Sequence, residues 1–138
     1  MKSITSDSDL YTLADKAGVK LNNVVSRDEL TKMPYDNYII NLAPSTSAGT
    51  HWVALYLPSG SGRQAVYFDS FGMIPPLEVI KLIRNSGHSA YLCNDKQIQD
   101  VRSGFCGEYC LAFLKYMNTP GSSQQNLKQF LSKFRKLN

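Results

Sequence analysis

Residue types that cooperate in nucleophilic catalysis occur in this chain at positions that a small fold could bring together. Cys106 lies in the segment Ser-Gly-Phe-Cys-Gly-Glu-Tyr-Cys, where a turn of small residues precedes an apolar helical pattern. Ser103 is a suitable N-cap for that helix, so the cysteine would lie in the first turn. The partial positive charge of a helix N-terminus favours the reactive thiolate. Taken alone, Cys106 fits better a small buried apolar residue, as most free cysteines are.

Two apolar strands upstream supply a candidate base and a candidate acid. Residues 51–57 and 64–69 are rich in aromatic and β-branched side chains, and a Pro-Ser-Gly-Ser-Gly turn separates them. A hairpin centred on Gly60 places His51 directly opposite Asp69, within hydrogen-bonding reach. A β-bulge would spoil this register. The hairpin therefore predicts an imidazole held by a carboxylate.

These residues match the needs of a cysteine protease, which are a thiolate, a base, a group that orients the base and a donor for the oxyanion. His51 would take and return the proton of Cys106, and Asp69 would fix the tautomer of the imidazole. The amide of Gln99, or that of Gln97, would bind the oxyanion together with the Cys106 backbone N–H. Each residue also has a structural explanation: a histidine at a strand end, an aspartate that opens a turn, a surface glutamine.

The ordered set of motifs resembles adenain, the adenovirus endopeptidase family, over nearly the whole chain. The resemblance is carried by His51-Trp52, the Asp-Ser-Phe-Gly segment at 69–72, Gln99 and Cys106-Gly107. The family pattern implies four catalytic roles: general base for His51, orienting acid for Asp69, oxyanion donor for Gln99 rather than Gln97, and nucleophile for Cys106. It also implies that Trp52 lies beside the substrate channel.

Asp69 departs from adenain, which has glutamate there, and agrees with the SUMO-deconjugating ubiquitin-like-protein proteases, a more distant resemblance. The chain is also shorter than adenain, as is typical of virophages and polinton-type DNA elements. The resemblance implies a viral cysteine endopeptidase that matures capsid precursors at glycine-containing sites, in the virion and in the cytoplasm or nucleus of the infected cell. The alternatives are a protease that removes ubiquitin-like modifiers and a catalytically silent binding module.

The elements that would position these residues follow from apolar periodicity. Helices are expected at 6–17, 26–31, 76–87, 106–117 and 123–136, and strands at 38–43, 51–57, 64–69, 90–93 and around residue 98. This order predicts an α+β fold in which helices flank a small mixed β-sheet and the nucleophile lies at the N-terminus of a central helix. All 138 residues are expected to form one domain.

Composition argues against membrane and secreted proteins and against metal sites. No apolar run approaches the length of about 18 residues that a membrane span needs, and the polar N-terminus lacks a secretory signal. The three cysteines are odd in number and lack zinc-like spacing, which predicts free thiols and no metal.

The expected partners are protein substrates, and no cofactor is required. The net charge of +4 comes from an acid-free C-terminal segment that carries Lys128, Lys133, Arg135 and Lys136. Such a helix could make weak contacts with nucleic acid, although a solvated helix face is the favoured interpretation. The resemblance to adenain implies a disulfide-linked peptide and DNA as candidate activators. Cys93 lies in the region of that link.

Overall fold

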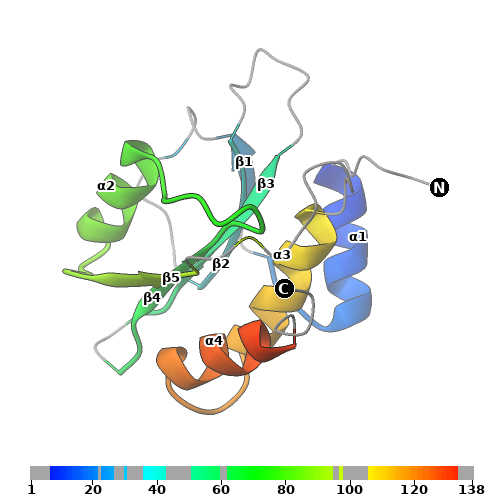
Figure 1. Ribbon diagram of the computed structural model, residues 1–138. Helices are drawn as coiled ribbons and strands as arrows, with labels where there is room; N and C mark the ends of the chain where they lie inside the picture. The colour runs from blue at the N-terminus through cyan, green and yellow to red at the C-terminus, as the bar shows by residue number, and fades with distance from the viewer. Residues whose placement is uncertain are drawn as a thin grey trace.

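A five-stranded mixed sheet forms the centre of the protein, with one helix on one face and three on the other (Figure 1). The computed structural model describes residues 7–21, 23–26, 30, 36–42, 51–59, 62–94, 97 and 106–133. The elements are α1 (Asp7–Ala17), β1 (Asn23–Ser26), β2 (Asp36–Asn41), β3 (Trp52–Leu57), β4 (Ala65–Phe68), α2 (Leu77–Asn85), β5 (Tyr91–Cys93), α3 (Cys106–Met117) and α4 (Ser123–Ser132). These elements confirm the predicted α+β class.

The strand order follows the chain, β1-β2-β3-β4-β5. The two central pairings, β2 with β3 and β3 with β4, are antiparallel. The two outer pairings, β1 with β2 and β4 with β5, are parallel. β3 therefore lies at the middle of the sheet, and all six of its residues are buried because helices cover both faces.

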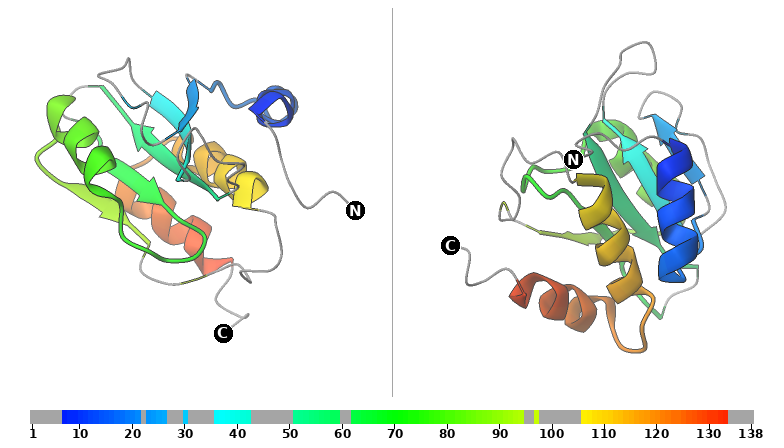
Figure 2. Two further views of the ribbon diagram at one scale, coloured as in Figure 1. Left: turned by 90° about the horizontal axis from the view of Figure 1, so that it is seen from above. Right: turned by 90° about the vertical axis from the view of Figure 1, so that its right-hand side faces the viewer.

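The two faces of the sheet form separate apolar clusters, because alternate side chains of a strand point to opposite faces. Helices α1, α3 and α4 pack on the face that carries Ile39, Ala54 and Phe68. Helix α2 packs on the face that carries Tyr38, Leu55 and Tyr67. Figure 2 shows α1 and α3 running side by side on the face that also carries α4.

Helix α3 is the central helix that the sequence predicts. Its apolar side chains recur at helical spacing, and Cys110, Phe113, Leu114 and Met117 are all fully buried. Phe113 stacks on Phe68 with ring centroids 5.0 Å apart, and the ring of Phe130 from α4 meets Phe68 edge-on at 5.3 Å. These aromatic contacts fix α3 and α4 on the sheet.

The expected helix at 26–31 is wrong where the structure describes it. Ser26 is the last residue of β1, and Leu30 has no regular structure, while 27–29 and 31 lie outside the described residues. Strand β1 is only four residues long, too short for a period to reveal it, and it is stabilised by parallel pairing with β2. The expected strand around residue 98 and the end of the last helix, 134–136, also lie outside the described residues.

The predicted hairpin register is also wrong, by two residues. The prediction paired Leu55 with Ala65, whereas the structure pairs Leu55 with Tyr67. Arg63 lies outside the ladder, and its guanidinium donates to the hydroxyl of Tyr56 and to the carbonyl of Met117 at the end of α3. A shift of two residues preserves the face on which each side chain lies, so the expected cluster survives the error.

Among the residues that the structure describes, none of the helices has the length and apolar character that a bilayer crossing requires.

Candidate active site

Cys106 is the first residue of α3 and lies against the beginning of β3. Its side chain is buried, and the backbone N–H of Trp52 donates to its sulfur at 3.3 Å. The expected cap, Ser103, lies outside the described residues. The position at the N-terminus of a twelve-residue helix is the one that the sequence predicts, and the helix dipole there favours negative charge on the sulfur.

His51 and Asp69 meet at the ends of the two central strands. Nε2 of His51 lies 2.7 Å from Oδ1 of Asp69, a distance typical of a charge-assisted hydrogen bond. Asp69 is fully buried, and the side chain of His51 is 22% exposed. The contact predicted from the hairpin is therefore present, although not by direct opposition. The last residues paired in the observed ladder are Ala54 and Phe68, so His51 and Asp69 meet just beyond its end.

The imidazole of His51 is held in a positively charged form. Burial alone would lower its pKa, but the hydrogen bond to Asp69 and the close approach to Cys106, together with the negative charge of both groups, raise the pKa of His51 to about 9. Since Nε2 is taken by Asp69, Nδ1 is the ring nitrogen left for Cys106. Nδ1 makes no hydrogen bond of ordinary geometry, as is common for catalytic pairs without substrate.

Two residues of the site were not predicted from the sequence. The ring of Phe71 stacks on the imidazole of His51 with centroids 4.1 Å apart, and its backbone N–H donates to Oδ1 of Asp69 at 2.8 Å. Asn94 is 2% exposed and hydrogen-bonds both backbone groups of Asp69. The sequence signal that could have found Asn94 is its place as a polar residue directly after an apolar strand, in Tyr-Leu-Cys-Asn. That strand, β5, pairs with β4, which ends just before Asp69.

Cys110 and Trp52 complete the surroundings of the sulfur. Cys110 is fully buried one turn along α3 and donates to the Trp52 carbonyl at 3.4 Å. Burial and neighbouring negative charges, first that of Cys106, raise its pKa well above the ordinary value, so its thiol stays neutral. Trp52 is 5% exposed and packs in the core between the sheet and α3, and both of its backbone polar groups contact cysteine sulfurs, so its expected place beside a substrate channel stays a prediction.

The expected oxyanion donor cannot be placed, because Gln99 lies outside the described residues. Gln97 is described and is exposed. None of Cys93, Cys106 and Cys110 forms a disulfide bond, and Cys93 is half-buried in β5. Within the described part of the chain, no group of three or more His, Cys, Asp or Glu side chains has an arrangement that could hold a metal ion.

The basic C-terminal segment is only partly described. Lys133 follows α4, and its ammonium lies 5.5 Å from the ring centroid of Tyr116, a cation–π contact. Arg135 and Lys136 lie outside the described residues. The only cation of α4 itself, Lys128, lines a shallow pocket.

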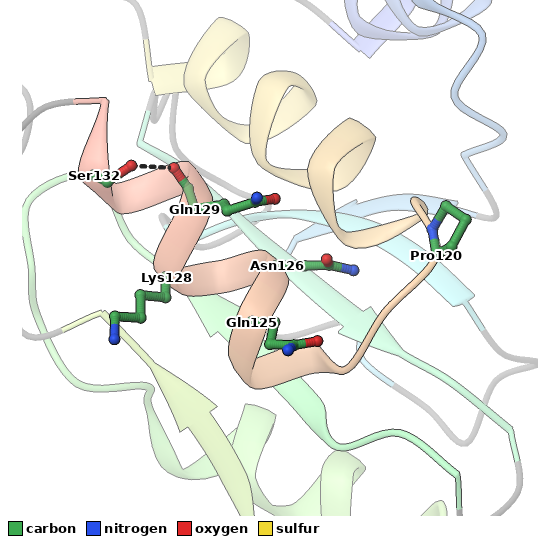
Figure 3. A pocket seen from close by; sticks show the side chains of 6 residues that line it. All are labelled: Pro120, Gln125, Asn126, Lys128, Gln129 and Ser132. Carbon is green, nitrogen blue, oxygen red and sulfur yellow. Dashed lines mark hydrogen bonds between the residues drawn. The ribbon is translucent and has the colours of Figure 1, made fainter.

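That pocket lies at the C-terminal end of α3, whereas Cys106 lies at the N-terminal end (Figure 3). Proline, amide and hydroxyl side chains line it together with one lysine: Pro120, Gln125, Asn126, Lys128, Gln129 and Ser132. None of these residues is a nucleophile paired with a base, so the pocket does not compete with the cluster around Cys106 as a catalytic site.

Comparison with solved structures finds this fold in a protease. The crystal structure of the selenomethionine ASFV pS273R protease matches with a TM-score of 0.52 and 22% sequence identity, over 75% of this chain and 44% of that chain. A second crystal structure of the ASFV pS273R protease matches with a TM-score of 0.48 and 21% identity, over 72% and 40% of the two chains. No protein-family model and no curated protein matches this chain. The chain thus shares the fold of the ASFV pS273R protease, and the match spans less than half of that protein's length.

Proposed function

We propose that the protein is a viral-type cysteine endopeptidase with Cys106 as nucleophile, His51 as general base and acid, and Asp69 as the group that orients the imidazole. One observation carries this proposal. The imidazole that makes a 2.7 Å hydrogen bond to a buried carboxylate also lies close enough to Cys106 for the two side chains to interact. That sulfur lies at the mouth of a long helix. Base, orienting acid and nucleophile thus converge from three separate elements.

The geometry supports an ion-pair mechanism. With a pKa of about 9, His51 is protonated at neutral pH, and its positive charge stabilises the thiolate form of Cys106. The thiolate attacks the scissile carbonyl carbon, and the backbone N–H of Cys106 with the amide of Gln99 would receive the oxyanion. His51 then protonates the leaving amine. In the second half, His51 takes a proton from the water that hydrolyses the thioester, which releases the acid and restores the ion pair.

The proposed substrates are virion precursor proteins cleaved at glycine-containing sites, in the virion or the infected cell. The support is the ordered motif His-Trp, Asp-Ser-Phe-Gly, Gln and Cys-Gly, together with a fold shared with a protease. A virophage or polinton-type source is proposed from the resemblance of these motifs to adenain. A peptide linked through Cys93, or DNA, is a proposed activator rather than a required cofactor. Nucleic acid would make at most weak contacts with the basic C-terminal residues.

Mass-spectrometric mapping of newly formed protein termini tests this function. The purified protein is incubated with a proteome-derived peptide library and, separately, with capsid precursor proteins of the proposed type. We expect cleavage that clusters at glycine-containing sites and disappears in Cys106→Ala. Cys110→Ala is the matched control, because it removes the same atom one helical turn away, and it should still cleave.

Two results would redirect the proposal. Cleavage confined to a SUMO or ubiquitin fusion would assign a deconjugating protease. Identical termini with wild-type protein and Cys106→Ala would leave a silent binding module and refute the peptidase.

A further inference from the structure

Asn94 occupies a position in the sheet from which it can control Asp69. Strands β4 and β5 are parallel, and the last pair of their ladder is Tyr67 with Cys93. Asn94 directly follows Cys93, and Asp69 lies two residues beyond Tyr67, so both residues come just after the last paired positions of the ladder. Asn94 is 2% exposed, although asparagine is mostly a surface residue. A buried amide of this kind needs hydrogen-bond partners.

The partners of the Asn94 amide are the two backbone groups of Asp69. The Asp69 N–H donates to Oδ1 of Asn94 at 3.0 Å, and Nδ2 of Asn94 donates to the Asp69 carbonyl at 2.6 Å. A carboxamide carries one acceptor and one donor side, as a peptide group does. The side chain of Asn94 therefore continues the β4–β5 ladder one step beyond the end of the strands, and fixes the peptide groups on both sides of Asp69.

The side chain of Asp69 is held separately. The Phe71 N–H donates to Oδ1, and the Gly72 N–H donates to the Asp69 carbonyl at 2.8 Å, closing a tight turn. Phe71 thus sets the direction of the carboxylate relative to the turn, whereas Asn94 sets the position of the turn relative to the sheet. Both are needed to keep Oδ1 at 2.7 Å from Nε2 of His51.

We propose that Asn94 is a positioning residue of the catalytic site, which clamps the backbone of Asp69 so that its carboxylate meets the imidazole of His51. This inference rests on the proposed peptidase function. Asn94 touches neither substrate nor sulfur in this scheme, and it acts through Asp69. A misplacement of about 1 Å in a catalytic group can cost on the order of a hundredfold in rate, so loss of the clamp should slow turnover by roughly ten- to a hundredfold.

The test compares Asn94→Ala with Asn126→Ala. Asn126 is a matched control, because it is 3% exposed and its Nδ2 donates to a backbone carbonyl, that of Thr119, far from the site at the start of α4. We expect Asn94→Ala to lower kcat with little change in KM, and Asn126→Ala to leave kcat per folded molecule unchanged. The pKa of His51, followed by NMR, should fall from about 9 towards 6.5 in Asn94→Ala alone.

A double-mutant cycle separates positioning from general support of the fold. In an Asp69→Asn background the orienting carboxylate is already gone, so adding Asn94→Ala should change kcat little. An equal loss of kcat in both backgrounds would overturn the proposal, as would a wild-type pKa of His51 in Asn94→Ala. The NMR titration does not depend on peptide cleavage, so it decides the question even if the proposed peptidase function fails.

If Asn94→Ala does not fold, Asn94→Asp replaces it. The aspartate keeps an oxygen that can accept from the Asp69 N–H but loses the donor to the Asp69 carbonyl. We expect reduced kcat in the folded variant, and turnover at the wild-type rate would contradict the role.

Discussion

The two ends of α3 both bring polar groups together, but they differ in how completely those groups are hydrogen-bonded. At the C-terminal end, the guanidinium of Arg63 donates to the carbonyls of Met117 and Thr119 at 3.1 and 2.8 Å. Asn118 donates to the side chain of Asn37 at 2.8 Å and caps its own helix. This end joins the β3–β4 hairpin, α3 and α4 into one body, and its hydrogen bonds are short.

At the N-terminal end of α3, two buried polar atoms lack hydrogen-bond partners. Nδ1 of His51 and Oδ2 of Asp69 have no hydrogen bond of ordinary geometry, although both are buried. A buried polar atom left without a hydrogen bond costs about 1–3 kcal/mol, and here two such atoms belong to one hydrogen-bonded pair. Helix α3 is therefore anchored at its C-terminal end, whereas the polar atoms at its N-terminal end are left available for a reactant.

The largest effect should come from removing the base. His51→Ala eliminates the proton carrier and should lower kcat by more than about 10⁴-fold, the scale seen when one member of a catalytic unit is lost. His88→Ala is the matched control, because its Nε2 contacts the Pro58 carbonyl at 2.7 Å, away from Cys106. A peptide-cleavage assay checks both variants. Substantial turnover in His51→Ala would show that His51 is not the catalytic base, and that its unpaired Nδ1 plays no part in the reaction.

The next largest effect should follow from Asp69→Asn. The amide cannot stabilise a protonated imidazole, and it favours the wrong tautomer, so kcat should fall by up to about 10⁴-fold. Steady-state kinetics should assign the loss to kcat. A variant whose KM rises while kcat stays normal would identify Asp69 as a substrate-binding residue rather than the orienting acid.

A substitution at the C-terminal end of α3 should lower the stability of the protein without changing kcat. Arg63→Ala removes three hydrogen bonds made by a charged group and should lower the free energy of unfolding by about 2–3 kcal/mol. Arg84→Ala, on the exposed side of α2, is the control and should change little. Urea denaturation measures both, and a cleavage assay on the folded fraction should give normal kcat. Equal stability of the two arginine variants would refute the anchoring role.

The smallest predicted effect is a pH dependence of stability. The pKa of His51 is about 9 in the folded protein, above its ordinary value of 6.5, so its contribution is complete below pH 6.5 and is lost as the pH rises through 9. The free energy of unfolding should therefore fall by about 2 kcal/mol between pH 6 and pH 8.5. Denaturation of Asp69→Asn across the same range should show a shallower slope. A slope that is unchanged in this variant would mean that the pair does not set the pKa.

Much of the fold could be predicted from the sequence, because its long elements are strongly periodic. The apolar spacing of α3 and the aromatic strands β3 and β4 were recognised, and so was the meeting of His51 with Asp69. The hairpin register was wrong, since nothing local indicates that Arg63 bonds to the end of α3. Strand β1 was missed because its partner, β2, lies more than ten residues away in the chain.

The reactive residues of the candidate site could be predicted from the sequence, but the residues that hold Asp69 and His51 in place could not. Cysteine, histidine and aspartate can be recognised as candidates from their reactive side chains. Asn94 and Phe71 matter only through the contacts that they make in the fold. Their contacts join β5 and a turn to Asp69, and no spacing rule in the sequence expresses such contacts. The role of Gln99 stays a prediction.

The central claim is that His51 activates Cys106, and alkylation by iodoacetamide tests it most directly. The rate of labelling at each cysteine is measured at pH 6 by mass spectrometry, in wild-type protein and in His51→Ala. Cys93 is half-buried and Cys110 fully buried, so they provide internal references. We predict that Cys106 is labelled fastest in the wild type and slows to the rate of Cys93 or below in His51→Ala. Labelling of Cys106 at the same rate in both proteins would contradict the account.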